Sequence, residues 1–509
     1  MTSINFCGRK FPLQPATWLV GLIAGSLLGC TGKAPAPLAS PPAQVTAVAV
    51  ALDSSEEPQT LNGHNITPWF NEVRDLVSRD LKVDLSSVLL RVVESDHIAI
   101  QARSSLLGAL SHDLENREFA ETLVDNILSG QTASILAIYS PAGKSILLHR
   151  SNLQEYMETN SSSVSTKSSL QALLIHELIH AADDVRHNAF DRQGASYQEV
   201  FAKSTIVEGH AQWQTRRLCK QAGCSGAFKA LNDYMFDVEA PDDPALRYVQ
   251  NRNFKNLEFV YREGERFIDK LMQRENGKEL VTFAFEQPPR DSIQIINPAS
   301  FPDLRRESQN QELSKAITNS RKPWGPGQKG TLKRNVLAAA AFSINPEARA
   351  PIIEFYTSKI LAAAKHEYYD RISDAPIPIA IIALRTNNDA TARKTAALIF
   401  DTTSKTYSGL GGELIKINNW KTKKHNNVLP GSKSRSGESD DTVKMYTARG
   451  DMQNGMVDAS YPVEVVTATS GRYIVHIDGR HSGLEQLMQY ASQLLATLKQ
   501  KELYAAIDQ

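Results

Sequence analysis

Residues 173–184 read LLIHELIHAADD, an apolar helical pattern interrupted by two histidines and a glutamate. Apolar segments exclude groups that lose hydration on burial unless a partner compensates them. A chain with this stretch must therefore pack the helix among other elements and still give His176, Glu177 and His180 a polar partner. This requirement constrains the fold more than any other feature of the sequence.

The spacing of these polar residues favours a metal ion as the partner. Residues four apart in an α-helix differ by about 40° in direction, so His176 and His180 project from one face, one turn apart. Glu177 lies one position round the helix, where its carboxylate can reach a water on the same ion without coordinating it. This is the HExxH arrangement of two ligands and a general base. The alternative is a core helix with hydrogen-bonded histidines.

A third ligand is expected downstream, because catalytic zinc is held by three protein ligands with one position open. We predict Glu208, in the segment VEGHAQW, on the next helical segment after His180. Gly209 beside it would allow two helices to approach closely. His210 is the competing ligand, but it lies two residues from Glu208 and therefore on a different helical face.

The surrounding patterns predict an α+β fold. Helical spacing predicts helices over 67–81, 119–130, 197–220 and 253–275, and the helix that carries the motif is expected to start at the end of the serine-rich loop 161–169. β runs predict strands over 88–93 and as two runs within 134–150, which would form a hairpin or a β corner. In the C-terminal part, IPIAIIAL, VEVVTAT and RYIVHI predict strands, and 336–361, 389–400 and 483–498 predict helices. The polar segment 421–441 is expected to be a mobile loop.

Four pieces of sequence occur in an order that resembles a known class of enzymes. They are HELIHAADD, VEGHA, YREGERF at 261–267 and PPRDSIQIINP at 288–298. The chain resembles gluzincin metallopeptidases, thermolysin-like in layout. It is most similar to a poorly characterised prokaryotic family with HELTHA-x-DDQ, ALVEGEA, Y-x-x-G-x-x-F and PP-x-S-T-x-Q-I-L-H-P. The resemblance covers roughly residues 130–300. It departs at Asn297, where the family usually has His, and at His210, where an acid is usual.

The resemblance implies a zincin-like core, a small β-sheet plus active-site helices, with Zn²⁺ on His176, His180 and Glu208. The metal would lower the pKa of its bound water and polarise a peptide carbonyl. Glu177 would take the proton of that water and pass it to the leaving amine. The expected substrate is a protein or peptide.

Further side chains near the motif have expected supporting roles. Tyr261 or His210 could donate to the tetrahedral oxyanion; alternatively, Tyr261 is a core aromatic and His210 a surface residue. Asp183 and Asp184 could orient a ligand histidine or face solvent. The β runs within 134–150 would offer an edge along which an extended peptide could lie.

The N-terminus predicts membrane anchoring. Arg9 and Lys10 precede the apolar run 18–28, which is too short to span a bilayer, and the run ends in LLGC at Cys30. This resembles the lipobox of bacterial lipoproteins, in which the cysteine is lipidated after cleavage. The next residue, Thr31, resembles the outer-membrane sorting pattern. The segment TGKAPAPLASPPAQ that follows resembles an extended tether. The resemblance implies an outer-membrane lipoprotein facing the periplasm.

Charge and cysteine usage exclude some classes. Lys+Arg and Asp+Glu both total 56. Without Arg9 and Lys10 the balance is 54 against 56, so there is no electrostatic case for binding nucleic acid. With Cys30 lipidated, Cys219 and Cys224 would remain in an oxidising compartment. They flank the turn KQAG and are expected to form a local disulfide.

The predicted organisation is a signal peptide at 1–29, a lipidated cysteine and tether at 30–60, a zincin-like domain at 61–305, a linker at 306–335 and a C-terminal α+β domain at 336–509. The predicted function is a membrane-anchored zinc metallopeptidase. One alternative is a zinc-binding envelope lipoprotein with a structural or assembly role and no turnover. Another is a peptidoglycan or amide hydrolase, which shares the metal chemistry.

Overall fold

The structure is a computed structural model. It describes residues 3–6, 9–12, 58–94, 135–160, 164–191, 197–236, 258–289, 292–302, 304–320, 331–333, 360–368, 379–409, 415–428, 442–454, 459–480 and 483–507, and the single residues 103, 107 and 121. Cys30, most of the tether and nearly all of the helix expected over 119–130 lie outside these residues. Each helix that the structure describes is too short or too polar to cross a membrane.

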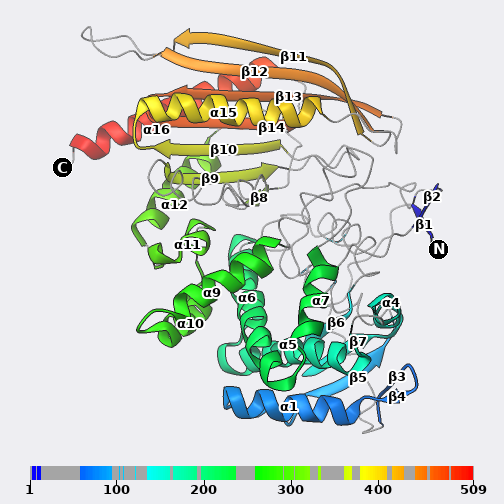
Figure 1. The fold of residues 1–509 in the computed structure, drawn as a ribbon. Coiled ribbons are helices and arrows are strands. Elements are labelled where there is room, and N and C mark those ends of the chain that lie inside the picture. The colour runs from blue at the N-terminus through cyan, green and yellow to red at the C-terminus, as the bar shows by residue number, and fades with distance from the viewer. Residues whose placement is uncertain are drawn as a thin grey trace, which may run out of the picture.

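The described chain is a mixed α+β structure, as predicted. In Figure 1 its N-terminal part is a group of helices around a small sheet, and its C-terminal part is a larger sheet flanked by helices. At the extreme N-terminus, within the predicted signal peptide, β1 (Ser3–Phe6) pairs antiparallel with β2 (Arg9–Pro12).

The small sheet of the N-terminal part has the order β5-β7-β6. Its strands are β5 (Leu89–Val93), β6 (Ala137–Ser140) and β7 (Ser145–His149). β5 runs parallel to β7, whereas β6 and β7 form the predicted antiparallel hairpin. A short pair, β3 (Thr60–Leu61) with β4 (His64–Asn65), precedes α1 (Thr67–Leu81), and α4 (Arg150–Asn160) follows β7. β6 is therefore an edge strand of this sheet.

The helix that carries the motif is α5 (Thr166–His187). It begins after Ser165, whose hydroxyl accepts a hydrogen bond of 3.2 Å from the backbone N–H of Ser168. It ends at Asn188, which adopts the left-handed conformation. Every residue of the range 169–183 is buried, because α1, α6, α7 and the small sheet all contact this helix. The histidines and the glutamate thus lie in the interior.

The remaining helices of the N-terminal part are α6 (Tyr197–Ala222), α7 (Ser225–Phe236), the π-helix η2 (Phe259–Glu263), α9 (Gly264–Met272), α10 (Gly277–Glu286), α11 (Ser292–Ile296) and the short 3-10 turn η3 (Pro298–Ser300). Of these, α6, α7 and α10 contact α5, η2 and α9 pack against α6, and α11 and η3 pack against α9. A disulfide between Cys219 and Cys224, both buried, joins the end of α6 to the start of α7.

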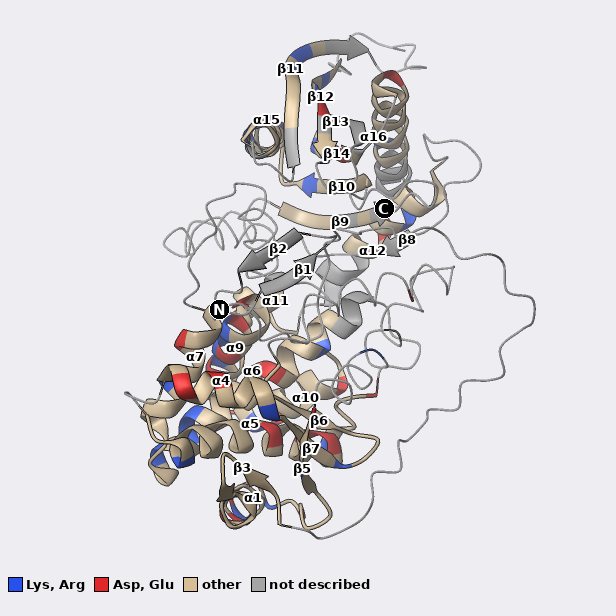
Figure 2. Ribbon diagram, turned by 90° about the vertical axis from the view of Figure 1, so that its right-hand side faces the viewer, with Lys and Arg blue, Asp and Glu red and all other residues tan. Residues whose placement is uncertain are grey.

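The C-terminal part contains a seven-stranded sheet of order β11-β12-β13-β14-β10-β9-β8, antiparallel throughout. Its strands are β8 (Thr331–Lys333), β9 (Ile360–Tyr368), β10 (Ile379–Thr386), β11 (Ile415–Val428), β12 (Thr442–Asn454), β13 (Ala459–Ser470) and β14 (Tyr473–Arg480). Helix α15 (Asp389–Ser408) covers one face, and α16 (Leu484–Ile507) covers the other (Figure 2).

Two expectations for this part were wrong at least in part, and a third, the helix over 336–361, lies almost entirely outside the described residues. The predicted linker 306–335 contains most of α12 (Leu304–Asn319), which packs beside α16, and also β8. Three apolar residues of α12, at i, i+3 and i+4, are buried in the C-terminal core: Leu313, Ala316 and Ile317. The Ala-rich segment 336–361 was predicted to be a helix. Its residues 336–359 lie outside the described part, and its last two, Ile360 and Leu361, belong to β9.

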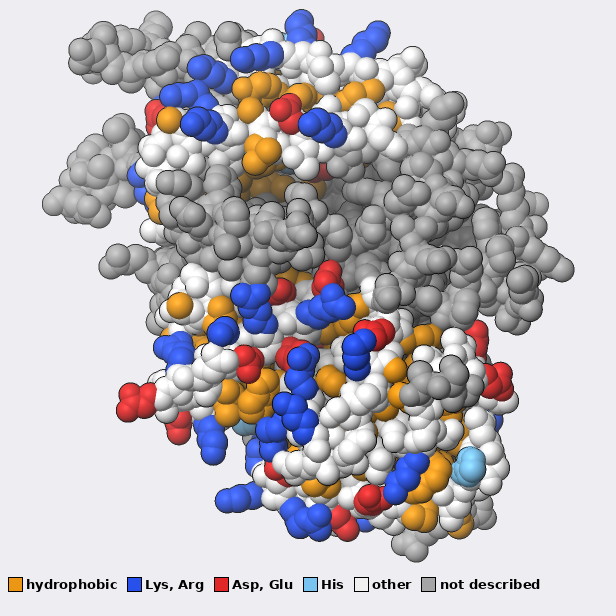
Figure 3. Space-filling view, in the orientation of Figure 1, with side chains coloured by type: hydrophobic (Ala, Val, Ile, Leu, Met, Phe, Trp, Pro, Cys, Tyr) orange, Lys and Arg blue, Asp and Glu red, His pale blue; other side chains and the backbone are white. Residues whose placement is uncertain are grey.

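The predicted loop 421–441 begins as strand, because β11 extends to Val428. β11 is an edge strand, and apolar and polar residues do not alternate in the part that carries its exposed lysines, Lys421, Lys423 and Lys424. The hydrophobic pattern of this segment therefore could not predict a strand. Basic side chains gather at the end of the molecule where Figure 1 places β11 (Figure 3). Lysines on an exposed edge discourage pairing with another sheet.

Candidate metal centre

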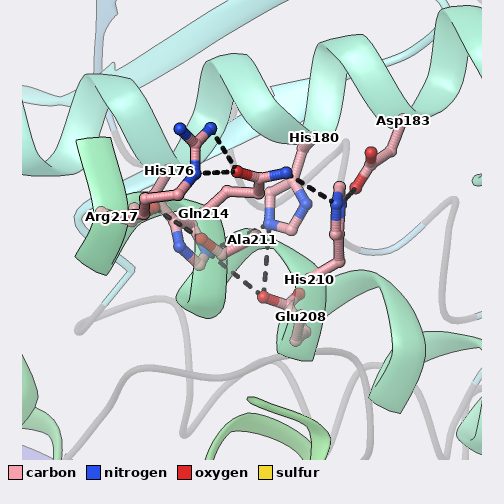
Figure 4. Close-up of polar contacts among 9 residues, drawn as sticks. His176, His180, Asp183, Glu208, His210, Ala211, Gln214 and Arg217 are labelled. Carbon is pink, nitrogen blue, oxygen red and sulfur yellow. Dashed lines mark hydrogen bonds and ion pairs between the residues drawn. The ribbon is translucent and has the colours of Figure 1, made fainter. Parts of the chain in front are cut away.

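Three predicted ligands converge in the interior of the N-terminal part. His176 and His180 project from α5 and Glu208 from α6 (Figure 4). The two Nε2 atoms are 3.1 Å apart, and each lies 3.3 Å from Oε2 of Glu208. Both histidines are buried. The three side chains could therefore hold one metal ion.

The site requires a positive charge at its centre. Burial alone would lower the pKa of His180, but the carboxylates of Glu208 and Glu177 outweigh burial and raise it to about 9. Burial likewise acts to raise the pKa of Glu208, but His180 and His176 hold it well below its usual range. Without a metal the carboxylate is thus paired with an imidazolium, and a metal ion would replace that proton.

A close contact between two helices places Glu208. A Cβ added to Gly209 would lie 2.1 Å from the carbonyl carbon of Gly264, and one added to Gly264 would lie 2.3 Å from the carbonyl oxygen of Thr205. Both positions therefore require glycine. The close approach predicted at Gly209 is real, and its partner is the glycine of the YREGERF segment. This contact brings Tyr261 to the ligands.

Tyr261 belongs both to the core and to the site. It is buried in the π-helix η2, a type of helical bulge that often occurs at functional sites. Its ring is stacked on His176, with centroids 6.2 Å apart and planes 14° apart. Burial, together with Glu208 and Glu177, raises the pKa of its hydroxyl well above 10.0. The hydroxyl therefore keeps its proton and donates it in a hydrogen bond to Glu208.

Glu177 is buried beside the ligand atoms. Burial raises the pKa of its carboxyl, although His180 and His176 act in the opposite direction. The backbone N–H of Tyr139 in β6 donates a hydrogen bond to this carboxylate. The edge strand of the small sheet therefore lies against the residue predicted to act as general base.

Neither ring nitrogen of His210 is free to donate a hydrogen bond to the ligand atoms of His176, His180 and Glu208. Its Nδ1 lies 2.9 Å from Oδ2 of Asp183, and its Nε2 lies 3.1 Å from Nε2 of Gln214 (Figure 4). Gln214 accepts hydrogen bonds from Arg217, which also pairs with Asp80 of α1. Both ring nitrogens of His210 are engaged and its side chain is buried, so it is not a surface residue, and the contacts that the structure gives it are with Asp183 and Gln214 rather than with the three ligand side chains.

Neither acid that follows the motif orients a ligand histidine through a contact that the structure shows. Asp183 bonds His210 of α6, and Asp184 accepts a hydrogen bond of 3.1 Å from the hydroxyl of Tyr139 in β6. These side chains are short and lie a turn beyond His180, so they meet the flanking elements instead. Among the described residues, Nδ1 of His180 has no hydrogen-bond partner, and the ring of Phe190 packs edge-on against this imidazole at 5.7 Å.

The pattern of residues did not reveal the role of Tyr139. Its contribution to Glu177 is a backbone N–H, which any residue except proline carries. Gly264 and Tyr261 were visible as a motif, but the contact of Gly264 with Gly209 was not. Comparison of the chain with models of protein families, with curated proteins and with solved structures finds no match.

Proposed function

We propose that this protein is a zinc-dependent peptidase with a zincin-like core. The observation that carries the proposal is the triangle of ligand atoms on His176, His180 and Glu208, with edges of 3.1, 3.3 and 3.3 Å. Tetrahedral zinc with bonds of about 2.0–2.1 Å has ligand atoms about 3.3–3.4 Å apart. Two imidazoles and one carboxylate also form a donor set of catalytic zinc, which leaves the fourth position open.

Zinc, when bound, would polarise a carbonyl and lower the pKa of water. Glu177 then accepts the proton of the attacking water and delivers it to the leaving amine. Its burial supports this role, because a carboxylate with a raised pKa is a stronger base and accepts the proton of water more readily. Tyr261 holds the carboxylate of Glu208 through its hydroxyl and fixes the ring of His176 by stacking.

A peptide substrate would lie along β6. This strand has β7 on one side, and its Tyr139 N–H points away from β7 towards Glu177. Backbone groups alternate along a strand, so Ala137 presents its N–H and C=O on the same edge and can pair with an extended peptide. A complex in which a peptide inhibitor binds away from β6 would refute this placement.

The membrane anchor is a separate part of the proposal and is supported by the LLGC pattern at Cys30. The mature protein would be an outer-membrane lipoprotein with its zinc site in the periplasm. Labelled palmitate should be incorporated into the parent protein and not into Cys30→Ala. Equal labelling of both proteins would remove the anchor from the proposal.

The zinc site and turnover are tested together with Glu177→Gln. The variant should bind one zinc ion as the parent does and lose hydrolysis of a peptide library, because the ligands stay and the base is removed. Glu275→Gln, which alters an exposed acid, is the matched control and should keep full activity. Zinc binding without hydrolysis in the parent would favour the structural lipoprotein, and digestion of purified cell wall instead of peptides would favour the amide hydrolase.

A further inference from the structure

Two adjacent acids follow the second histidine and reach opposite neighbours of α5. Asp183 is 1% exposed, and its Oδ2 lies 2.9 Å from Nδ1 of His210 on α6. Asp184 accepts a hydrogen bond from the hydroxyl of Tyr139 on β6 at 3.1 Å. α6 carries the third ligand, and β6 carries the N–H that meets Glu177.

We propose that Asp183 and Asp184 are positioning residues with separate tasks. Asp183 sets the position of Glu208 through α6, and so controls metal affinity. Asp184 sets the Tyr139 N–H against Glu177 through β6, and so controls turnover. The inference deepens the proposed function and rests on it for the assignment of turnover to Glu177.

The Asp183 side is a chain of buried polar contacts. Oε1 of Gln214 accepts from Nε and Nη2 of Arg217, at 3.0 and 2.7 Å. The amide nitrogen of Gln214 must therefore face His210 and donate to its Nε2 at 3.1 Å. His210 then carries its proton on Nδ1 and donates it to Asp183.

This chain continues to α1, because Nη1 of Arg217 donates to Oδ1 of Asp80 at 2.9 Å. α6 is thus tied to α5 by Asp183 and to α1 by Asp80. A rotation of α6 about its axis would break these contacts and leave buried polar groups unpaired, which is unfavourable. Glu208 lies two residues from His210 on the same helix, so the same rotation would carry its carboxylate away from the histidines.

The Asp184 side acts through a single residue of β6. The side chain of Tyr139 is buried and donates to Asp184, and its backbone N–H donates to Glu177. The ring of Phe190 packs against the rings of Tyr139 and His180, at 5.6 and 5.7 Å. Because β6 is a short edge strand, its outer side is held by these contacts with α5 rather than by another strand.

The experiment uses the full chain and three measurements: zinc affinity by competition with a chelator, kcat and KM for a peptide substrate, and hydrogen exchange of residues 137–140. Asp183→Ala and His210→Ala should each weaken zinc binding, by up to the about 10- to 100-fold that loss of a direct partner of a metal ligand costs. The double variant should be no weaker than either single variant. Asp183→Asn should restore affinity, because its amide oxygen still accepts from His210.

Tyr139→Phe removes the hydroxyl and keeps the backbone N–H. This variant and Asp184→Ala should each leave zinc affinity within about twofold, and lower kcat about tenfold or more without a matching rise in KM, within the usual range for general base catalysis. Both should accelerate hydrogen exchange at 137–140, and combining them should add nothing further. Asp233→Ala, an exposed acid on α7, is the control and should change none of these values.

The inference is overturned if Asp183→Ala keeps the zinc affinity of the parent, or if Tyr139→Phe weakens zinc binding as strongly as Asp183→Ala. It is also overturned if Asp184→Ala leaves exchange at 137–140 unchanged. A parent that binds zinc but hydrolyses no peptide would defeat the proposed function and, with it, the turnover assignment. Zinc affinity and hydrogen exchange would still decide whether the two acids hold α6 and β6.

Discussion

The contact between Gly209 and Gly264 predicts a large effect for a very small change. In Gly209→Ala the new methyl would lie 2.1 Å from the carbonyl carbon of Gly264 and 2.4 Å from its oxygen. Non-bonded carbons rest at about 3.5–4.0 Å, so α6 and α9 must part by about 1.4–1.9 Å. Overpacking of this kind costs about 1–3 kcal/mol of unfolding free energy.

The same displacement should damage the metal centre. A hydrogen bond does not survive a separation of that size, so Tyr261 would lose its contact with Glu208. We expect zinc affinity to fall about 10- to 100-fold. Urea unfolding measured by tryptophan fluorescence and chelator competition give the two quantities.

Gly226→Ala on α7 is the matched control, because its new methyl would meet no atom within 4 Å. Replacing glycine by alanine in a helix without steric conflict stabilises by about 0.4–1 kcal/mol. The reasoning fails if Gly209→Ala unfolds at the urea midpoint of the parent and binds zinc as tightly. It also fails if both alanine variants lose the same stability.

Three further predictions concern protonation, Tyr261 and α12. The pKa of His180 is raised in the folded protein, to about 9 from 6.5. Its pairing with Glu208 therefore stabilises the metal-free protein fully below pH 6.5, and this stabilisation is lost as the pH rises towards 9. Zinc must displace the proton of His180, so the affinity of the protein for zinc should rise about tenfold per pH unit up to about pH 9. Chelator competition that gives the same zinc affinity at every pH from 6 to 9 would contradict this. Tyr261→Phe keeps the ring and loses the bond to Glu208, so calorimetry should show zinc affinity lowered about 10-fold or more; an unchanged affinity would exclude its role in holding Glu208. Ile317→Ala should destabilise the C-terminal part by about 2–5 kcal/mol, whereas in a linker it would have no effect on unfolding.

Much of the N-terminal part was predictable because its signals are local. The periodicity of α1, the hairpin of β6 and β7 and the cap of α5 all depend on residues close together in sequence. α12 was missed because its three buried apolar residues lie in a largely polar segment, and β11 because an exposed edge strand needs no apolar alternation. In both cases the deciding partner is another element of the C-terminal sheet, β9 for α12 and β12 for β11.

The sequence by itself determined the arrangement of the candidate metal ligands on α5: helical geometry places His176 and His180 on one face and Glu177 beside them, whatever the rest of the chain does. Tertiary structure alone decided which groups surround them. It assigned Tyr261 to Glu208, the Tyr139 N–H to Glu177, and His210 to Asp183 rather than to the ligands. Spacing along one helix fixes directions within that helix, whereas contacts between elements depend on how they pack, at positions such as Gly209 where two backbones meet.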